Sequence, residues 1–228
     1  KREAVPGALH ALQIHRADLK AQRILGSGQF GEVYLAEHTT DGKELKRAVK
    51  MLKNGASPDA KEEFVRECNM MVQAGVHKNI VKMIGVALQQ PPWLCVLEFL
   101  PYGDLQGLVS DLAAENKVLE LGVILNLSQQ LISGCEHLAS KRIVHMDLAA
   151  RNVLVGHKNL VKIADLGLAH DMSKDGDFYI LPKRIPLALK WMSPESMETL
   201  FFSEYSDVWA LGVTIWEIFI SVVALLCC

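Results

Sequence analysis

Two short segments hold carboxylate and carboxamide side chains at spacings suited to catalysis. In the first, Asn152 follows Asp147 by five residues, and in the second Asp165 begins the run Asp-Leu-Gly. A carboxylate such as Asp147 can accept a hydroxyl proton, whereas the oxygens of Asn152 and Asp165 are hard ligands that suit Mg²⁺ on a triphosphate. Each residue alone could be a turn-forming Asx residue, but their order and spacing together favour a phosphoryl-transfer site.

A glycine-rich segment lies more than one hundred residues earlier. Gly26-Ser27-Gly28-Gln29-Phe30-Gly31 has the pattern G-x-G-x-x-G, which is weak evidence alone. A dinucleotide-binding fingerprint would be followed by a helix, whereas Glu32–Ala36 alternates like a strand. We therefore predict a strand-turn-strand flap whose backbone N–H groups approach phosphates closely, because glycine has no Cβ.

A lysine and a glutamate downstream are predicted to pair. Ala48 and Lys50 share one face of the strand predicted at 45–51, where Ala48 could cover a flat base and Lys50 could reach the α- and β-phosphates. A solvated strand lysine is the simpler alternative for Lys50 alone. Glu67 lies on the apolar side of a predicted helix, with Phe64 and Met71, so it requires a cation, and Lys50 is the candidate.

Hydrophobic periodicity predicts the elements that position these residues. Ser57-Pro58-Asp59 resembles a helix start, and apolar residues at helical spacing extend that helix to about Ala74. The same patterns predict strands at 80–88 and 93–99, a break at 101–104 and a core helix at 119–140. After these come short strands near 153 and 161, a polar stretch at 170–184 and an apolar terminal helix.

The composition is that of an ordinary globular protein and excludes several other classes. The 228 residues include 24 Lys and Arg against 26 Asp and Glu, and this net charge of −2 provides no general basic surface for nucleic acid. The five cysteines include no C-x-x-C pair, which indicates a reducing compartment rather than a disulfide framework.

From about Leu19 to Phe219 the chain resembles a protein kinase catalytic domain, with its motifs in the family's order. The segment Asp147-Leu-Ala-Ala-Arg-Asn152 is similar to the catalytic loop of the tyrosine kinase group, and Lys190-Trp-Met-Ser-Pro-Glu195 to the end of its activation segment. The resemblance implies an α+β, bilobal protein-kinase-like fold. We expect a small antiparallel β-sheet lobe with one helix at 1–100 and a larger, mainly helical lobe at 101–228, around a nucleotide cleft.

The resemblance also implies a role for individual residues. Asp147 would be the base for a tyrosine hydroxyl, assisted by Arg151, and Lys50 paired with Glu67 would hold the ATP phosphates. Asn152 and Asp165 would bind Mg²⁺. Leu97 matches the gatekeeper beside the adenine-binding hinge. The ATP-binding set implied is Gly26, Ser27, Gly28, Gly31, Val33, Ala48, Lys50, Glu98, Leu100, Asp104 and Leu154.

Two positions within the resemblance differ from the usual family pattern. Leu166 replaces a phenylalanine, a mild change because leucine still supplies an apolar side chain. Met146 occupies the position of an arginine that grips a phosphorylated activation loop in most kinases. Tyr179 is the only tyrosine between Asp165 and Glu195, so it is the candidate autophosphorylation site, with a packing role as the alternative. Without the arginine, a phosphate on Tyr179 would lack its usual partner, which argues against control by loop phosphorylation.

The last residues are the third departure from the family pattern. From about residue 220 the sequence no longer follows the family, so we expect a C-terminally truncated domain, incomplete at the end of its larger lobe. Residues 208–228 contain one charge, Glu217, and are long enough for a membrane span. The kinase pattern up to Ile218 instead favours a buried core helix, which can be apolar on all sides.

Three functions are compatible with these features. The first is an ATP- and Mg²⁺-dependent tyrosine kinase domain that acts on protein substrates bearing tyrosine, with a cytoplasmic location and no nucleic-acid partner. The second is a catalytically inactive, truncated kinase-like module with a binding or regulatory role. The third, a serine/threonine kinase, is disfavoured because Ala149 and Arg151 replace the lysine pattern of that group. A membrane would be involved only through a receptor or an anchor outside this segment.

Overall fold

The structure, a computed structural model, describes residues 7–27, 31–173, 176–182 and 186–226, with only the backbone for 221–226. Its contacts divide the chain into two units, residues 1–75 with 82–99, and residues 76–81 with 100–228. Our boundary at residue 100 assigned 76–81 to the first lobe, but this segment belongs to the second unit. There, the Val81 N–H donates to the Ile163 carbonyl at 2.8 Å, and Asn79 Nδ2 donates to the Val161 carbonyl at 2.8 Å.

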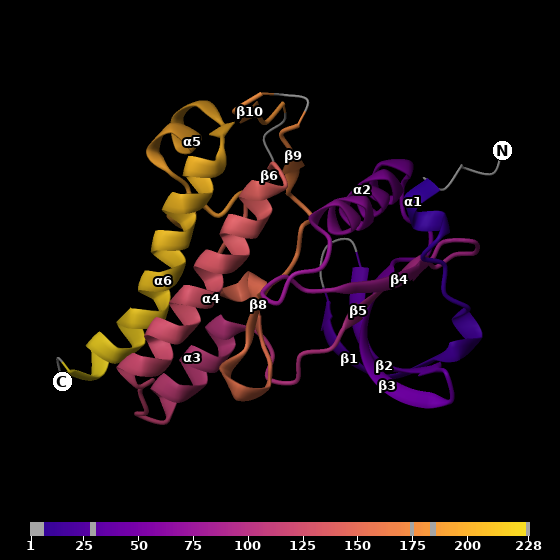
Figure 1. The fold of residues 1–228 in the computed structure, drawn as a ribbon, viewed down its shortest axis with the longest axis horizontal. Coiled ribbons are helices and arrows are strands. Elements are labelled where there is room, and N and C mark those ends of the chain that lie inside the picture. The colour runs from indigo at the N-terminus through magenta and orange to yellow at the C-terminus, as the bar shows by residue number, and fades with distance from the viewer. Residues whose placement is uncertain (1–6, 28–30, 174–175, 183–185, 227–228) are drawn as a thin grey trace. The chain divides into compact units, whose positions relative to one another are not determined.

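An antiparallel sheet of five strands forms most of the first unit (Figure 1). The strands are β1 (Leu19–Ser27), β2 (Gly31–Thr40), β3 (Lys43–Leu52), β4 (Met83–Ala87) and β5 (Leu94–Glu98), in the spatial order β1-β2-β3-β5-β4. One face packs into a core of Ala36, Val49, Ala87, Leu94 and Val96. Because successive side chains of a strand point to opposite faces, Ala48 and Lys50, on either side of Val49, project from the other face of β3.

The long helix α2 (Pro58–Ala74) has the bounds that the sequence predicts. The Ser57 hydroxyl oxygen accepts from the Ala60 N–H at 3.2 Å, Pro58 occupies the first helical turn, and Gly75, with φ of 70°, ends the helix. Two further elements precede the sheet, α1 (Gly7–His10) and a 3₁₀ turn at Arg16–Asp18. The sequence pattern did not predict α1, which packs against α2.

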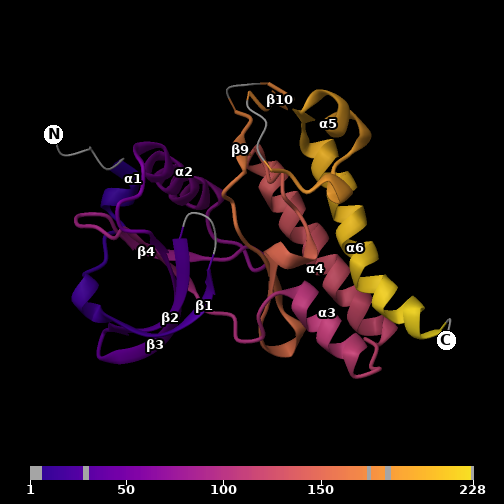
Figure 2. The same cartoon turned by 180° about the vertical axis from the view of Figure 1, so that it is seen from behind.

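Helices form most of the second unit, where α6 (Glu204–Leu226) packs against both α3 (Leu105–Ala114) and α4 (Leu121–Ser140) (Figure 2). The remaining elements are short and connect these helices. The strands are β6 (Ile143–Val144), β7 (Val153–Val155), β8 (Val161–Ile163), β9 (His170–Asp171), β10 (Tyr179–Ile180) and β11 (Phe201–Phe202). Between them lie 3₁₀ turns at Ala150–Asn152, His157–Asn159 and Leu189–Trp191, and the short helix α5 (Pro194–Thr199). The α+β class, with an antiparallel sheet in one part and a mainly helical second part, is confirmed.

Helix α6 includes most of the apolar stretch that the sequence left open as a membrane span. None of the helices in the described ranges is both long and apolar enough to cross a bilayer. Within the second unit, Ala210, Thr214 and Ile218 of α6 are buried. This helix therefore contributes a buried face to the protein's own core.

Gly31 at the start of β2 allows a close approach between two strands. A Cβ placed on Gly31 would lie 2.3 Å from the Met51 carbonyl oxygen of β3, whereas one on Gly26 would have no atom within 4 Å. We expect Gly31→Ala to lower the free energy of unfolding by about 1–3 kcal/mol, and Gly26→Ala to change it by less than about 1 kcal/mol. Hydrogen exchange over peptides of β2 and β3 measures the difference, and equal protection in both variants would contradict it.

Candidate active site

The Asp147 carboxylate lies in a compact hydrogen-bond cluster. Its Oδ1 accepts from Arg151 Nη2, and its Oδ2 accepts from Asn152 Nδ2 at 2.7 Å. Asn152 Nδ2 also donates to the main-chain oxygen of Asp147 at 2.7 Å. The Asp147 side chain keeps 22% of its surface exposed. The cluster therefore fixes a partly exposed carboxylate in one orientation, as a proton acceptor requires.

His145 and Asp207 hold the same loop from its inner side. The Asp207 carboxylate accepts from the His145 N–H at 2.6 Å and from the Met146 N–H at 3.0 Å. His145 Nδ1 accepts from the Asp147 N–H at 3.2 Å, so its Nε2 is the nitrogen that donates to the Ala164 carbonyl, at 3.1 Å. These bonds satisfy three successive N–H groups of a loop that has no strand partner there.

Asn152 and Asp165 are joined by the main chain. The Asn152 carbonyl accepts from the Ala164 N–H at 2.8 Å, directly before Asp165. Because Asn152 Nδ2 points to Asp147, its Oδ1 remains an acceptor, and Asp165 is an exposed residue. No group of three or more His, Cys, Asp or Glu suited to a metal occurs among the described residues. Mg²⁺ bound with a nucleotide needs only one or two protein oxygens, so this pair fits it.

Lys50 and Glu67 form the ion pair that the sequence predicts, within the first unit. Lys50 Nζ lies 2.6 Å from both carboxylate oxygens of Glu67, and the side chains are 25% and 13% exposed. Lys50 lies on β3 and Glu67 on α2, so the pair fixes the sheet relative to that helix. A partly buried pair with two short hydrogen bonds holds the ammonium in one position.

Two of the predicted ATP-binding residues, Val33 and Ala48, and the predicted gatekeeper Leu97 share the sheet face of Lys50. Val33 pairs with Lys50 across β2 and β3, and Ala48 pairs with Leu97 across β3 and β5. Residues directly opposite in antiparallel strands project to the same face. Val33, Ala48 and Leu97 thus provide apolar surface beside the lysine.

The glycine-rich segment is described in part. Gly26 and Ser27 end β1, and Gly31 begins β2, where Gly26 pairs with Val33 and Ser27 with Glu32. The antiparallel pairing agrees with the strand-turn-strand flap predicted from the sequence. Gly28 lies outside the described residues.

The remaining predicted nucleotide residues are Glu98, which ends β5 in the first unit, and Leu100, Asp104 and Leu154 in the second unit. The Glu98 N–H donates to the Lys82 carbonyl at 3.0 Å. No residue in the described part of the chain accepts a hydrogen bond from the Leu100 N–H. Asp104 caps α3 by accepting from the Gly107 N–H at 2.8 Å, and its main chain bridges to Leu154. Leu100 therefore offers a donor, whereas the Asp104 carboxylate already has a local partner.

Met146 is buried in an apolar cluster of the second unit. It is 8% exposed and packs with Val144, Met172, Met192 and Phe202, while Tyr179 lies against the same cluster. The ring of Tyr179 also stacks on His170, with centroids 3.6 Å apart. The position where most kinases have a phosphate-gripping arginine is thus filled by apolar packing, and methionine adapts well to such an irregular gap.

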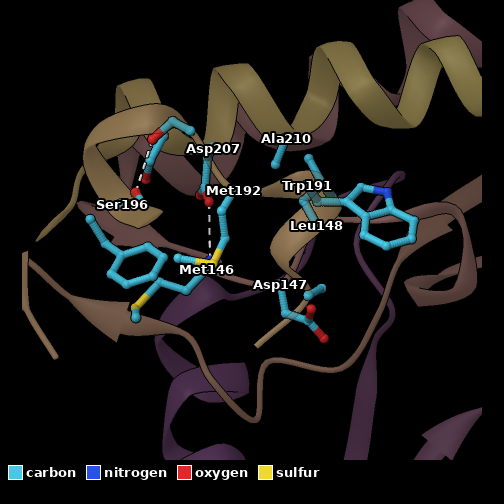
Figure 3. Close-up of a pocket in the computed structure, with 12 residues that line it drawn as sticks. Met146, Asp147, Leu148, Trp191, Met192, Ser196, Asp207 and Ala210 are labelled. Carbon is cyan, nitrogen blue, oxygen red and sulfur yellow. Dashed lines mark hydrogen bonds between the residues drawn. The ribbon is translucent and has the colours of Figure 1, made fainter. Parts of the chain in front are cut away.

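Figure 3 shows a small cavity between α6 and the loop that carries Asp147. Asp207 points toward Met146, and the Asp147 carboxylate points away from α6. The cavity has a volume of about 10 Å³, which is room for about one water molecule. It is therefore a packing gap and not a ligand site.

Two further residues, Trp191 and Glu217, support the Asp147 cluster and were not predicted from the sequence. The face of the Trp191 ring lies 4.8 Å from Arg151 Cζ, and its Nε1 donates to Glu217 Oε2 at 2.8 Å. One feature of the sequence could have pointed to Glu217, since it is the only charged residue in 208–228.

Comparison with known proteins defines the class to which this fold and site belong. A family model described as protein tyrosine and serine/threonine kinase matches residues 19–223, so the chain belongs to that family. The predicted resemblance to tyrosine kinases is also confirmed, over about 90% of the chain. The tyrosine-protein kinase transforming protein Abl of Abelson murine leukemia virus is 38% identical over 206 residues, which cover 90% of this chain and 26% of the relative.

Two further relatives are similar to the same extent. The BDNF/NT-3 growth factors receptor of Gallus gallus is 39% identical over 218 residues, covering 90% of this chain and 26% of the receptor. The tyrosine-protein kinase transforming protein ros of UR2 avian sarcoma virus is 38% identical over 215 residues, covering 89% and 53%. The chain thus spans between about a quarter and about half the length of these relatives.

The burial of Met146 leads to a prediction about stability. Met146→Arg would place a guanidinium in the apolar cluster, where the neighbouring Asp207 carboxylate already accepts from the main-chain N–H groups of His145 and Met146, so we expect the free energy of unfolding to fall by about 3 kcal/mol or more. Met146→Leu keeps the volume and should lower it by less than about 1.5 kcal/mol. Urea unfolding followed by tryptophan fluorescence measures both, and an arginine variant as stable as the leucine variant would refute the apolar cluster.

The environment of Asp207 leads to a prediction about pH. Desolvation by burial raises the pKa of Asp207 above its ordinary value, although His145 and the two main-chain N–H groups act in the opposite direction. Because the folded-state pKa is the higher one, the stability that this group contributes is complete below the unfolded-state pKa of about 3.9. It is lost as the pH rises through the folded-state pKa.

We therefore expect the stability advantage of the parent chain over Asp207→Asn to shrink as the pH rises from about 4 to about 7. Asparagine does not titrate, so the stability of Asp207→Asn at each pH is the reference for the parent chain at the same pH. Urea unfolding at several pH values gives the comparison, and an advantage that grows with pH would show a depressed pKa instead.

Proposed function

We propose that this chain is the catalytic domain of a tyrosine-protein kinase, which transfers the γ-phosphate of ATP to tyrosine hydroxyls of proteins. The observation that supports this most is the pairing of Arg151 with Asp147. In the tyrosine kinase pattern the cation that accompanies the catalytic carboxylate is an arginine four residues later, and here that arginine donates to Asp147 Oδ1. The similarity to tyrosine-protein kinases over about 90% of the chain supports the same substrate.

Asp147 is proposed to accept the hydrogen bond of the tyrosine hydroxyl and, as transfer proceeds, its proton. Arg151 and Asn152 hold the two oxygens of Asp147, so the carboxylate is oriented before the substrate arrives. Such positioning accelerates phosphoryl transfer because little covalent chemistry remains for the protein to perform.

Lys50 is proposed to bind the α- and β-phosphates of ATP, with Glu67 fixing its ammonium group. Val33, Ala48 and Leu154 would contact the adenine, and Glu98 and Leu100 would bind its edge through the main chain. Leu97 would limit the space behind the base as the gatekeeper, and Asp104 would contact the ribose. Gly26, Ser27, Gly28 and Gly31 would cover the phosphates with main-chain N–H groups.

Asn152 and Asp165 are proposed to hold Mg²⁺ through their side-chain oxygens. The ion would neutralise charge that develops on the transferred phosphoryl group. Both residues also have protein contacts that fix their position, Asn152 to Asp147 and Asp165 Oδ1 to the Gly167 N–H at 3.2 Å.

Tyr179 remains the candidate autophosphorylation site. Its half-buried ring stacks on His170 and packs against the Met146 cluster, which supplies no cation for a phosphate. This favours an activation segment held by apolar packing, and the packing alternative for Tyr179 stays open beside the modification.

Phosphate transfer to a poly(Glu,Tyr) peptide tests the proposed function. We expect the parent chain with ATP and Mg²⁺ to label the peptide, and Asp147→Asn and Lys50→Met each to lower kcat/KM by at least about 100-fold. Lys46→Met is the matched control, because Lys46 is an exposed lysine on the same strand β3. It should retain the parent activity.

Two outcomes would refute the proposal. Labelling that persists in Asp147→Asn would show that another group performs the transfer. A parent chain that unfolds cooperatively and labels nothing would instead support the catalytically inactive binding or regulatory module.

A further inference from the structure

Glu217 is an unusual residue for its position in α6. It is the only charged residue in 208–228, and it lies one helical turn after the buried Thr214 and directly before the buried Ile218. A carboxylate at such a position is costly to desolvate unless it accepts strong hydrogen bonds. The N–H groups that donate to Glu217 therefore indicate the role of its charge.

One carboxylate oxygen of Glu217 accepts two hydrogen bonds from different segments. The Ala150 N–H donates to Oε2 at 2.9 Å, and Trp191 Nε1 donates to the same oxygen at 2.8 Å. Ala150 belongs to the loop of Asp147, whereas Trp191 ends the 3₁₀ turn Leu189–Trp191, which follows the polar segment 170–184. Hydrogen bonds to an ionised acceptor are stronger than neutral ones, so Glu217 joins these two segments firmly.

Trp191 extends this connection to Arg151. The Arg151 guanidinium carbon lies 4.8 Å from the Trp191 ring centroid, well within the range of a cation–π interaction. A proton donor that hydrogen-bonds a carboxylate becomes richer in electrons, so the bond to Glu217 strengthens the attraction of the ring for Arg151. The Arg151 guanidinium in turn donates to Asp147.

We propose that Glu217 is a positioning residue for phosphoryl transfer, which orients Arg151, and through it Asp147, by holding the Trp191 ring on one side and the adjacent Ala150 main chain on the other. This inference rests on the proposed function and adds to it a residue that touches neither substrate nor nucleotide. The Trp191 ring holds Arg151 on one face, so the guanidinium approaches Asp147 from a fixed direction. When the guanidinium no longer approaches Asp147 from that direction, the rate of phosphate transfer falls. The residues proposed to bind ATP are unchanged.

Kinetics of the full chain with poly(Glu,Tyr) and Mg²⁺–ATP test the inference. We expect Glu217→Ala to lower kcat by about 10- to 100-fold, because small displacements of reacting groups have effects of that size, and to change the KM for ATP by less than about twofold. Glu217→Gln retains one acceptor oxygen and should recover part of the loss. Glu204→Gln, an exposed carboxylate in the first turn of the same helix, is the matched control.

A double-mutant cycle separates positioning from a purely structural role. If Glu217 acts through Arg151, then Glu217→Gln should lower kcat in the Arg151→Ala background by less than about twofold, because coupled residues are not additive. Trp191→Phe keeps a ring but removes the N–H donor, and should reproduce the Glu217→Gln effect on kcat. Two losses that simply multiply, or a kcat of Glu217→Gln equal to that of the parent, would overturn the inference.

The possible failures are distinguishable. If Glu217→Ala fails to fold in a thermal melt, Glu217→Gln and Trp191→Phe still decide the matter. An active parent chain with an unaffected Glu217→Gln variant refutes the positioning role and leaves the proposed function intact. A folded parent chain that transfers no phosphate refutes both.

Discussion

The loop that carries Asp147 depends on two carboxylates of one helix. Asp207 and Glu217 of α6 accept the N–H groups of His145, Met146 and Ala150, three loop donors that would otherwise be buried without partners. The two residues lie ten positions apart on α6, about 15 Å along the helix axis. Between the anchored loop residues, Ala149 has φ of −163° and ψ of 160°, and this extended residue helps the loop to reach from one anchor to the other.

These anchors also explain how the loop retains an unfavourable backbone conformation. Met146 has φ of 65° and Asp165 has φ of 57°, a region that residues other than glycine rarely adopt. Aspartate tolerates it because its side chain can bond the local main chain, as Asp165 does with the Gly167 N–H. Methionine has no such bond, so the hydrogen bond to Asp207 and the apolar cluster must hold Met146 in place. Strain of this kind is typical where a site is preorganised.

Local signals made much of the fold predictable from sequence. Helix α2 was predicted with its observed bounds because Ser57, Pro58 and Gly75 are capping residues whose effect does not depend on distant contacts. The two-residue strands β9 and β10 were not predicted, since a pair of residues has no periodicity. Segment 76–81 was assigned to the wrong unit because its partners, such as Ile163, lie more than eighty residues away in sequence. Distant pairing, and not local preference, determines such features.

The same distinction applies to the site and explains the charge in the apolar helix. Asp147, Asn152 and Asp165 lie close in sequence, so their spacing alone indicated a common chemistry. Glu217 accepts hydrogen bonds from residues 67 and 26 positions earlier. In the sequence alone it is therefore only a single charge within a possible membrane span. In hydrocarbon a carboxylate without donors would be strongly unfavourable. Its two N–H donors in the second unit remove that difficulty, so the isolated charge is accounted for by the folded domain itself.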